Sequence, residues 1–516
     1  MDNSHASVLI AGGSIAGLML ANLLELASVD YLVLEKYRTI APDLGASIGI
    51  SANSARLLDQ IGVWNKLEQL YDREDVYDSF TSAHADGQKF IYIENGAPLL
   101  RSHFGYQLVF IDRQQLIQIL YDNLKNKNRV LVNQEINRVE SHDKGVRVTT
   151  SNGQIFTGKV IVGADGIHSA VRKEMWRLGS QADPVTWSMA DLDTVPVEWR
   201  CIYGISKPNS DLTPRNVTYR QGDGHSYLTM AGPQDKVYWF LFEKLEQPTR
   251  GLYEKVPRYT NDDLEQVVAK YATDVVAGNV TLGSLYETSI SATLQALPEM
   301  TLPRWHFERM VLIGDAAHKF NPIAGQGSAQ AIEDAAVLAN RLAPLLRSTR
   351  SQSCTQTELN SAFETFQAKR LQRATTMEKM SNYTQQIDGM NGYWHKFMAQ
   401  YIVPFLIKDE SSMIKLWSER ILGAARFDFA EMPHRPHSIL YDDEKPLKPD
   451  AGAYSVGTVC ALGATIFSIC VASRMFFEIC GGGEGDSVAG EFKGAGWCEK
   501  GGTRVDLRLG RPWTKE

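Results

Sequence analysis

A glycine-rich stretch near the start of the chain combines residue types that can bind a dinucleotide. Gly12, Gly13, Ser14 and Gly17 stand between an apolar run typical of a strand and an apolar helical stretch, and Glu35 ends a second apolar run. Such a turn lets free N–H groups at a helix start face a pyrophosphate, while the acid accepts hydrogen bonds from ribose hydroxyl groups. Ser14 replaces the middle glycine of the usual fingerprint, which crowds the approach of the backbone to a phosphate. We expect a dinucleotide-binding unit, the alternative being an ordinary glycine turn.

Two further acidic residues follow apolar runs much later in the chain. Asp165 and Asp315 each come at the end of a predicted buried strand, where a carboxylate can hold a ribityl hydroxyl group. After Asp315 the chain continues through a Gly-Gln-Gly turn at 325–327 into a helix that begins near Ser328. That helix start directs N–H groups at one point, which favours the negative charge of a reduced flavin. The three stretches together predict one flavin dinucleotide site.

The elements that must position these groups change in type along the chain. Residues 75–110 and 183–290 contain short runs of alternating polarity separated by turn signals, which is typical of an antiparallel sheet. Their many aromatic side chains suit a large apolar substrate, or they simply fill the core of the sheet. Residues 346–445 are typical of helices. The sequence therefore predicts an α/β fold with a helical closing segment.

The composition excludes several classes of protein. Of 516 residues, 44% are apolar and 22% are charged, which rules out a mainly disordered chain. The net charge of −7 argues against nucleic acid as a partner. The six cysteines include no C-x-x-C pair, so we expect no zinc site, iron–sulfur cluster or other metal.

The C-terminal part of the chain differs from the rest. Residues 451–473 contain no charged side chain, and as a helix they would be long enough to cross a membrane; a buried helix or an apolar tail is the alternative. Basic residues are slightly more numerous before this run than after it, which places the larger N-terminal part in the cytosol. We therefore expect a single-pass membrane protein, with residues 474–516 as a disordered tail.

Five stretches together resemble one known family. They are the glycine turn with Glu35, GASIGISANSARLL at 45–58, VFIDR at 109–113, GADGIHSAVR at 163–172, and GDAAH followed by Pro and GQG at 314–327. In this order they are similar to single-component FAD-dependent aromatic hydroxylases and epoxidases with the p-hydroxybenzoate hydroxylase fold. The resemblance is strongest to the branch that epoxidises prenyl side chains in indole-diterpene and meroterpenoid biosynthesis, and it covers roughly residues 7–430.

This resemblance implies a Rossmann-like FAD-binding domain of the GR2 type, interleaved with an antiparallel sheet that binds the substrate. The implied boundaries are FAD-binding parts at 1–74, 112–182 and 301–345, substrate-sheet parts at 75–111 and 183–300, a helical closing segment at 346–450, the transmembrane helix at 451–473 and the tail at 474–516.

The resemblance also implies roles for single residues. Glu35 would hold the adenosine ribose, and Asp315 the ribityl chain. Arg113 would reach the phosphate or ribityl region, unless it forms a surface ion pair. The other implied cofactor-binding residues are Gly12, Gly13, Ser14, Gly17, Gly49, Asp165 and Ser328. Tyr219 and Arg200 stand where relatives place groups that orient the substrate, and they are the catalytic candidates.

The implied activity is that of an FAD-dependent monooxygenase, with FAD as cofactor and NAD(P)H as reducing co-substrate. It would transfer one oxygen atom of O₂ from the flavin C4a position to a small lipophilic, prenylated terpenoid or meroterpenoid intermediate of secondary metabolism, and so form an epoxide. An alkene needs no deprotonation, and no buried acid–base pair stands out in the sequence. Three alternatives stay open: a phenol hydroxylase of the same fold, a membrane-associated flavin-dependent reductase of prenyl double bonds, and a flavin-binding protein without catalytic activity.

Overall fold

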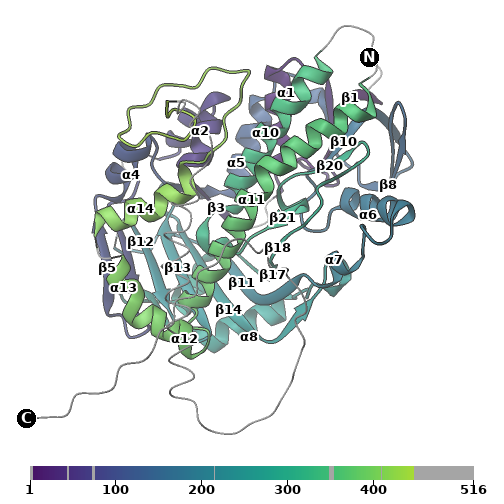
Figure 1. Ribbon diagram of the computed structural model, residues 1–516. Helices are drawn as coiled ribbons and strands as arrows, with labels where there is room; N and C mark the ends of the chain where they lie inside the picture. The colour runs from purple at the N-terminus through teal and green to yellow at the C-terminus, as the bar shows by residue number, and fades with distance from the viewer. Residues whose placement is uncertain are drawn as a thin grey trace, which may run out of the picture. The chain divides into compact units, whose positions relative to one another are not determined.

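Two large sheets share one hydrophobic core and are joined by a long helix (Figure 1). The computed structural model describes residues 4–42, 46–71, 76–213, 215–347, 354–407 and 409–446. The described residues up to Lys445 belong to one compact unit. This is the α/β architecture that the sequence predicts.

The first sheet has a parallel centre. Its spatial order is β19 (His306–Phe307), β20 (Met310–Leu312), β10 (Ile155–Gly163), β1 (His5–Ala11), β2 (Tyr31–Leu34) and β7 (Val130–Leu131), and the antiparallel β9 (Gly145–Thr150) and β8 (Ile136–His142) extend from β10. Because β1, β2, β10 and β20 run parallel, Gly12, Glu35, Asp165 and Asp315 all follow strand ends at the same edge. The sheet thus collects the three predicted stretches at one place.

Helices cover the parallel strands, whose residues are almost continuously apolar, as burial on both faces requires. α1 (Ile15–Leu26), α5 (Arg113–Asn123) and α10 (Gly327–Leu346) pack together, and α6 (Ala170–Ala182) packs against β8, β10 and β20. The shorter elements are α2 (Ala52–Gln60), α3 (Trp64–Glu68), α4 (Gly96–Phe104), α7 (Ala190–Asp193), and the strand pairs β3 (Ser47–Ile50) with β6 (Val109–Asp112), β15 (Val275–Ala277) with β16 (Val280–Thr281), and β18 (Met300–Thr301) with β21 (His318–Lys319).

The second sheet is mainly antiparallel. Its spatial order is β17 (Ser289–Pro298), β11 (Pro196–Ser206), β14 (Val237–Arg250), β13 (His225–Ala231), β12 (Asn216–Gln221), β4 (Ser79–Ala83) and β5 (Lys89–Glu94). The pair of β4 with β12 is parallel, because β4 reaches this sheet from a distant part of the chain rather than through a hairpin. Strands from 75–111 and from 183–300 therefore form a single sheet.

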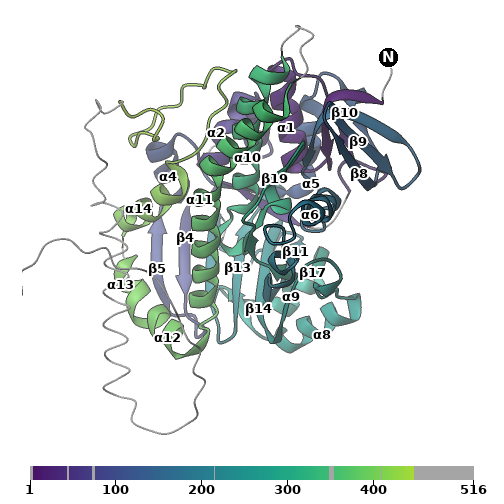
Figure 2. The same cartoon turned by 45° about the vertical axis from the view of Figure 1, so that its right-hand side comes forward.

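The two faces of the second sheet have different neighbours. α8 (Asn261–Tyr271) and α9 (Leu282–Glu287) cover one face, where Ile202 and Leu241 pack with Leu264 and Leu285 in a core of their own. The opposite face belongs to the main core. α11 (Gln356–Asp388) packs against α10 at one end of its course and against β13 further along, so it spans both halves (Figure 2).

The predicted helical closing segment contains α11, then α12 (Gly392–Phe397), a π-helix (Met398–Ile402), α13 (Val403–Leu406) and α14 (Glu410–Ile421). The prediction of a single-pass membrane location is contradicted: in the part of the chain that the structure describes, no helix combines the length and apolarity that a span requires. The segment 451–473 itself lies outside the described residues, as does 474–516. The described helices long enough to cross a membrane, α10 and α11, both contain charged side chains, among them Glu333 and Asp334 in α10 and Arg370 in α11.

Candidate functional site

A cavity of about 510 Å³ is lined by residues of both sheets and of the helices between them. Its size is within the range of small-molecule and cofactor sites. Most of the predicted site residues line it: Gly12, Ser14, Glu35, Gly49, Arg113, Asp165, Tyr219, Asp315 and Ser328. Gly13, Gly17 and Arg200 are not among the lining residues.

The glycine turn is built by close backbone contacts. Gly12 has a φ of +100°, and a Cβ there would lie 2.6 Å from the carbonyl oxygen of Ala164. A Cβ on Gly17 would lie 2.0 Å from the carbonyl oxygen of Gly12, so Gly17 serves by packing beneath the turn rather than by lining the cavity. The Gly13 N–H donates to Oε2 of the buried Glu35 over 2.6 Å. The strand end thus holds the turn, and the N-terminus of α1 has no side-chain cap of its own.

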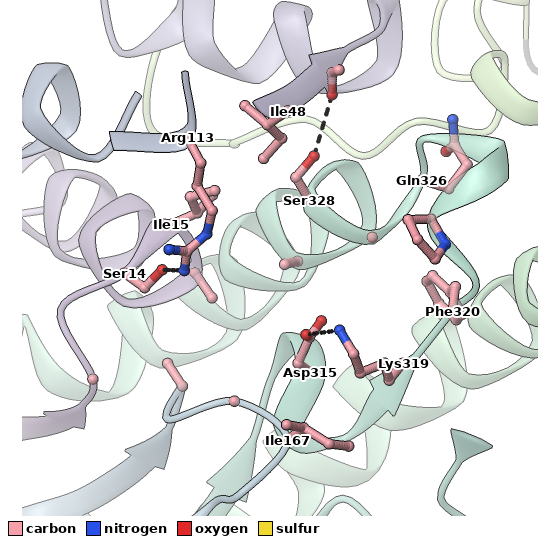
Figure 3. Close-up of a pocket in the computed structure, with 18 of the residues that line it drawn as sticks. Ser14, Ile15, Ile48, Arg113, Ile167, Asp315, Lys319, Phe320, Gln326 and Ser328 are labelled. Carbon is pink, nitrogen blue, oxygen red and sulfur yellow. Dashed lines mark hydrogen bonds and ion pairs between the residues drawn. The ribbon is translucent and has the colours of Figure 1, made fainter. Parts of the chain in front are cut away.

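Ser14 and Arg113 form one unit at this turn (Figure 3). Nη2 of Arg113 donates to Oγ of Ser14 over 2.6 Å, which joins the start of α5 to the start of α1. Burial lowers the pKa of Arg113, while the carboxylates of Asp315 and Glu35 oppose that shift. The serine that departs from the glycine fingerprint therefore supplies an acceptor for a buried guanidinium.

Asp315 is paired with a residue that the sequence did not single out. Nζ of Lys319 lies 2.5 Å from Oδ2 of Asp315 (Figure 3). Burial raises the pKa of Asp315, but Lys319, His318 and Arg113 outweigh it and hold that pKa below its ordinary value. The carboxylate is thus ionised and able to accept a hydroxyl donor. The spacing of four residues between Asp315 and Lys319 was the available signal.

Asp165 caps a helix and keeps one oxygen free of partners. Its Oδ2 accepts from the backbone N–H groups of Ala170 (2.7 Å) and Val171 (3.2 Å) at the start of α6. Its Oδ1 is buried and has no hydrogen-bond partner among the described residues. Burial raises the pKa of this carboxyl group. A buried oxygen without a partner at the cavity edge is suited to a donor from a ligand.

The Gly-Gln-Gly turn and β3 approach each other across the cavity. Oγ of Ser328, in the first turn of α10, donates to the carbonyl oxygen of Gly49 over 3.4 Å (Figure 3). A Cβ on Gly49 would lie 2.9 Å from the ring of Phe110, which explains the glycine. α10, like α1, begins without a side-chain cap. Two uncapped helix starts, a glycine cradle and the free Asp165 oxygen fit the pyrophosphate, ribityl and ring portions of FAD.

The second sheet contributes one row of side chains to the cavity, which we call the sheet wall: Tyr203, Phe240, Leu228 and Tyr219. These residues are direct cross-strand neighbours on β11, β14, β13 and β12. The rings of Tyr203 and Phe240 meet edge to face, with centroids 5.5 Å apart. Burial raises the pKa of Tyr219 to about 12, so its hydroxyl group stays protonated near neutral pH.

Arg200 lies on the other face of the same sheet. It is three residues from Tyr203 on β11, and side chains alternate along a strand, so the two point to opposite faces. Its Nη2 lies 2.7 Å from Oε2 of Glu243, its cross-strand neighbour, and Lys270 of α8 completes the cluster. The structure gives Arg200 a part in joining the sheet to α8, away from the cavity.

A buried polar network behind the Gly-Gln-Gly turn was missed by sequence reasoning. Arg370 of α11 lies 2.6 Å from Oε2 of Glu333 and 2.7 Å from Oδ1 of Asp334, and all three side chains are buried. Asp334 also accepts from the Gly314 N–H (2.9 Å) and contacts Nε2 of His318 (2.6 Å). His318 therefore contacts the carboxylate that holds the Gly314 backbone, and it does not line the cavity. Two adjacent acids inside an apolar helix were the signal for such a network.

Two lining residues come from α14, which sequence reasoning did not connect with the site. Trp417 and Arg420 lie three residues apart and both face the cavity. No short motif marks them.

Comparisons with known proteins agree with this geometry. A family described as the FAD binding domain matches residues 5–381. The FAD-dependent monooxygenase andE of Emericella variicolor is 35% identical over 405 residues, which cover 78% of this chain and 84% of that protein. The FAD-dependent monooxygenase nvfK of Aspergillus novofumigatus is 33% identical over 435 residues, or 84% of this chain and 90% of that protein. Klebsiella pneumoniae HpxO, in a crystal structure with FAD and uric acid, shares the fold with a TM-score of 0.62 at 19% identity, over 80% of this chain and 96% of its own.

Proposed function

The chain belongs to the FAD-binding family of FAD-dependent monooxygenases, and from this premise we propose that it epoxidises a prenyl alkene of a terpenoid or meroterpenoid intermediate in secondary metabolism. FAD is the cofactor of this enzyme, and the predicted oxidoreductase class is confirmed. NAD(P)H is the typical co-substrate of the family.

The observation that carries the choice of an alkene is the chemistry of the sheet wall. Among the described lining residues, every carboxylate lies on the FAD-binding elements: Glu35, Glu135, Asp165 and Asp315. The sheet wall carries neither a carboxylate nor an imidazole, and Tyr219 has a pKa of about 12. A phenol hydroxylase benefits from a base that activates the ring, whereas an alkene reacts without one.

The residues divide the work between the two ends of the cavity. When bound, FAD supplies electron transfer and the activation of O₂. Ser14, Arg113 and the start of α1 would hold its pyrophosphate region, Glu35 the ribose, and Asp315 the ribityl chain. Gly49 and the start of α10 at Ser328 would border the ring.

The sheet wall would orient the substrate and keep water from the reacting atoms. Phe240 and Leu228 are almost fully buried and present apolar surface to the cavity. The protonated Tyr219 hydroxyl would donate a hydrogen bond to the substrate. Exclusion of water favours transfer of oxygen to carbon over the release of H₂O₂.

The test is product analysis with the full chain loaded with FAD. The enzyme would be incubated with NADPH, ¹⁸O₂ and a farnesylated hydroxybenzoate, and the product identified by mass spectrometry and NMR. We expect one ¹⁸O atom on a former alkene carbon. One ¹⁸O atom on the aromatic ring would establish a phenol hydroxylase, and a product with two added hydrogens and no ¹⁸O a prenyl reductase; either result would replace the proposal.

A further inference from the structure

α14 closes the cavity over the sheet wall with a mixed apolar and cationic face. Met413, Ile414 and Ile421 are buried and anchor the helix, which packs against α2 and α4. Trp417 and Arg420, one turn apart, face the cavity that Tyr219 lines from β12. The guanidinium of Arg420 lies over the ring of Trp417, with 5.8 Å between its Cζ and the ring centroid.

Within the described ranges of the chain, the guanidinium of Arg420 stacks on Trp417 but has no hydrogen-bond acceptor. It forms no ion pair there, and its Nε is buried without a hydrogen bond. The ionisable groups near it are Tyr219, Glu419 and Asp388, and none of them accepts a hydrogen bond from it. Burial accordingly lowers the pKa of Arg420, and these neighbours only partly oppose that shift.

The buried Arg172 and Arg370 show how a guanidinium can be fully paired within this chain. Arg172 donates from Nε to Tyr253 and from its two terminal nitrogens to the carbonyl oxygens of Ala316 and Ile167. Arg370 contacts two carboxylates and the Gln330 side chain. Arg420 is different: among the described residues outside its own helix, its hydrogen bond is made by the backbone carbonyl oxygen, which accepts from Nη2 of Arg373 over 2.8 Å. The helix end is therefore fixed while the side chain keeps its donors.

Arg420 is half-buried and its Nε is fully buried, so leaving that N–H without an acceptor is costly unless a ligand supplies one. A guanidinium has five N–H donors and no acceptor, so its partner must supply acceptor oxygens. The cavity lining beside it, Trp417 and the sheet wall, is apolar or aromatic, and the nearby carboxylates of Glu419 and Asp388 accept no hydrogen bond from it. The site is therefore matched to an apolar skeleton that carries an oxygen acceptor.

We propose that Arg420 is a specificity-determining residue that donates hydrogen bonds to a carboxylate, phenolate or carbonyl oxygen of the substrate, while Trp417 and the sheet wall hold its apolar part. The inference rests on the proposed function, and it narrows the substrate class to oxygenated prenylated molecules as against prenyl hydrocarbons.

α14 lies beyond residues 5–381, the part that matches the FAD binding domain, as a substrate-specific element would.

The experiment measures how tightly two probes bind to the oxidised full-length holoenzyme. Binding is detected as a change in the flavin absorption spectrum. The two probes are a farnesylated hydroxybenzoate and farnesylbenzene, which has the same chain without oxygen. We expect the wild type to bind the oxygenated probe about 10- to 100-fold more tightly. Arg420→Gln should remove most of this preference by weakening only the oxygenated probe, and Arg420→Lys should restore part of it because the charge remains without the planar fork.

Lys415→Gln is the matched control, since it removes a cation from the exposed face of the same helix. The proposal is overturned if the wild type binds both probes equally or neither, or if Arg420→Gln weakens both probes alike, which would indicate a structural role. If Arg420→Gln fails to retain FAD, the affinities of Arg420→Lys for the two probes are compared instead. A weaker preference for the oxygenated probe than in the wild type supports the proposal, and an unchanged preference overturns it. These outcomes are separate from the proposed function, because binding is measured without NADPH and the identity of the product is measured with it.

Discussion

Arg113 donates from Nη2 to Oγ of Ser14 over 2.6 Å. This hydrogen bond joins the start of α5 to Ser14, the residue before α1 that replaces the middle glycine of the fingerprint. Burial lowers the pKa of Arg113, which shows that its guanidinium is shielded from water. The Ser14 hydroxyl therefore accepts a hydrogen bond that water would otherwise accept. Substitution of this pair is a direct test of how the cofactor is held.

Ser14→Ala should weaken FAD binding by about tenfold, because a hydrogen bond to a charged donor is lost. The measurement is fluorescence titration of the apoprotein with FAD. In a double-mutant cycle with Arg113→Ala, the second substitution should cost less when the first is present. Additive effects would show that the two residues act on FAD independently.

Glu299 should make stability depend on pH. It is buried, with Asn321 and Asn382 as hydrogen-bond donors, and burial raises its pKa from 4.5 to about 7. The folded state thus holds a proton that the unfolded chain releases near pH 4.5, so this contribution to stability falls as the pH rises from about 5 to about 7, by about 3 kcal/mol at most. Glu299→Gln should reduce the difference between the free energies of unfolding measured at pH 5 and at pH 8. If the free energy of unfolding of the variant changed with pH as steeply as that of the wild type, Glu299 would not be the group responsible.

Arg370→Met should lower the free energy of unfolding by about 3 kcal/mol, because it removes the cation shared by two buried carboxylates and leaves only Arg373 beside Glu333 and only His318 beside Asp334. Urea denaturation measures the loss. Lys369→Met, on the exposed side of the same helix, is the matched control and should cost less than about 0.5 kcal/mol. Equal costs for the two variants would mean that the network contributes little.

Leu228→Asn should uncouple the reaction. Its side chain lies in the sheet wall and is 2% exposed, so a polar amide there would admit water to the cavity. We expect the H₂O₂ formed per NADPH to rise severalfold with FAD content unchanged, as measured by a peroxidase-coupled assay. Leu228→Met keeps the apolar volume and should remain coupled. Unchanged coupling in the Asn variant would argue against a role of the wall in excluding water.

Tyr219 and Arg200 should behave differently although both were candidates from the sequence. Tyr219→Phe should lower kcat/KM by about tenfold through loss of a substrate hydrogen bond. Arg200→Gln should change kcat/KM by less than about threefold and lower stability by about 1–3 kcal/mol, since its partner Glu243 is buried. Steady-state kinetics and thermal unfolding measure both. A large loss of kcat/KM in a fully folded Arg200→Gln protein would return that residue to the catalytic site.

The sequence by itself determined the cofactor half. Gly12, Glu35 and Asp315 each follow an apolar strand, and parallel strands place their carboxyl ends at one edge, so local patterns were enough to group them. The family and the monooxygenase activity followed from the same stretches and are confirmed.

Only the tertiary structure decided the substrate half, because its determinants are long-range. The face of β11 that meets the cavity depends on which side α8 covers, and this is why Arg200 faces away while Tyr203 faces inward. Arg420 and Tyr219 line the same cavity because α14 packs against α2 and α4, an arrangement of distant segments that no local periodicity encodes. The partners of Glu333 and Asp334 likewise come from another helix, since buried charges are paired by packing and not by neighbouring residues in the chain.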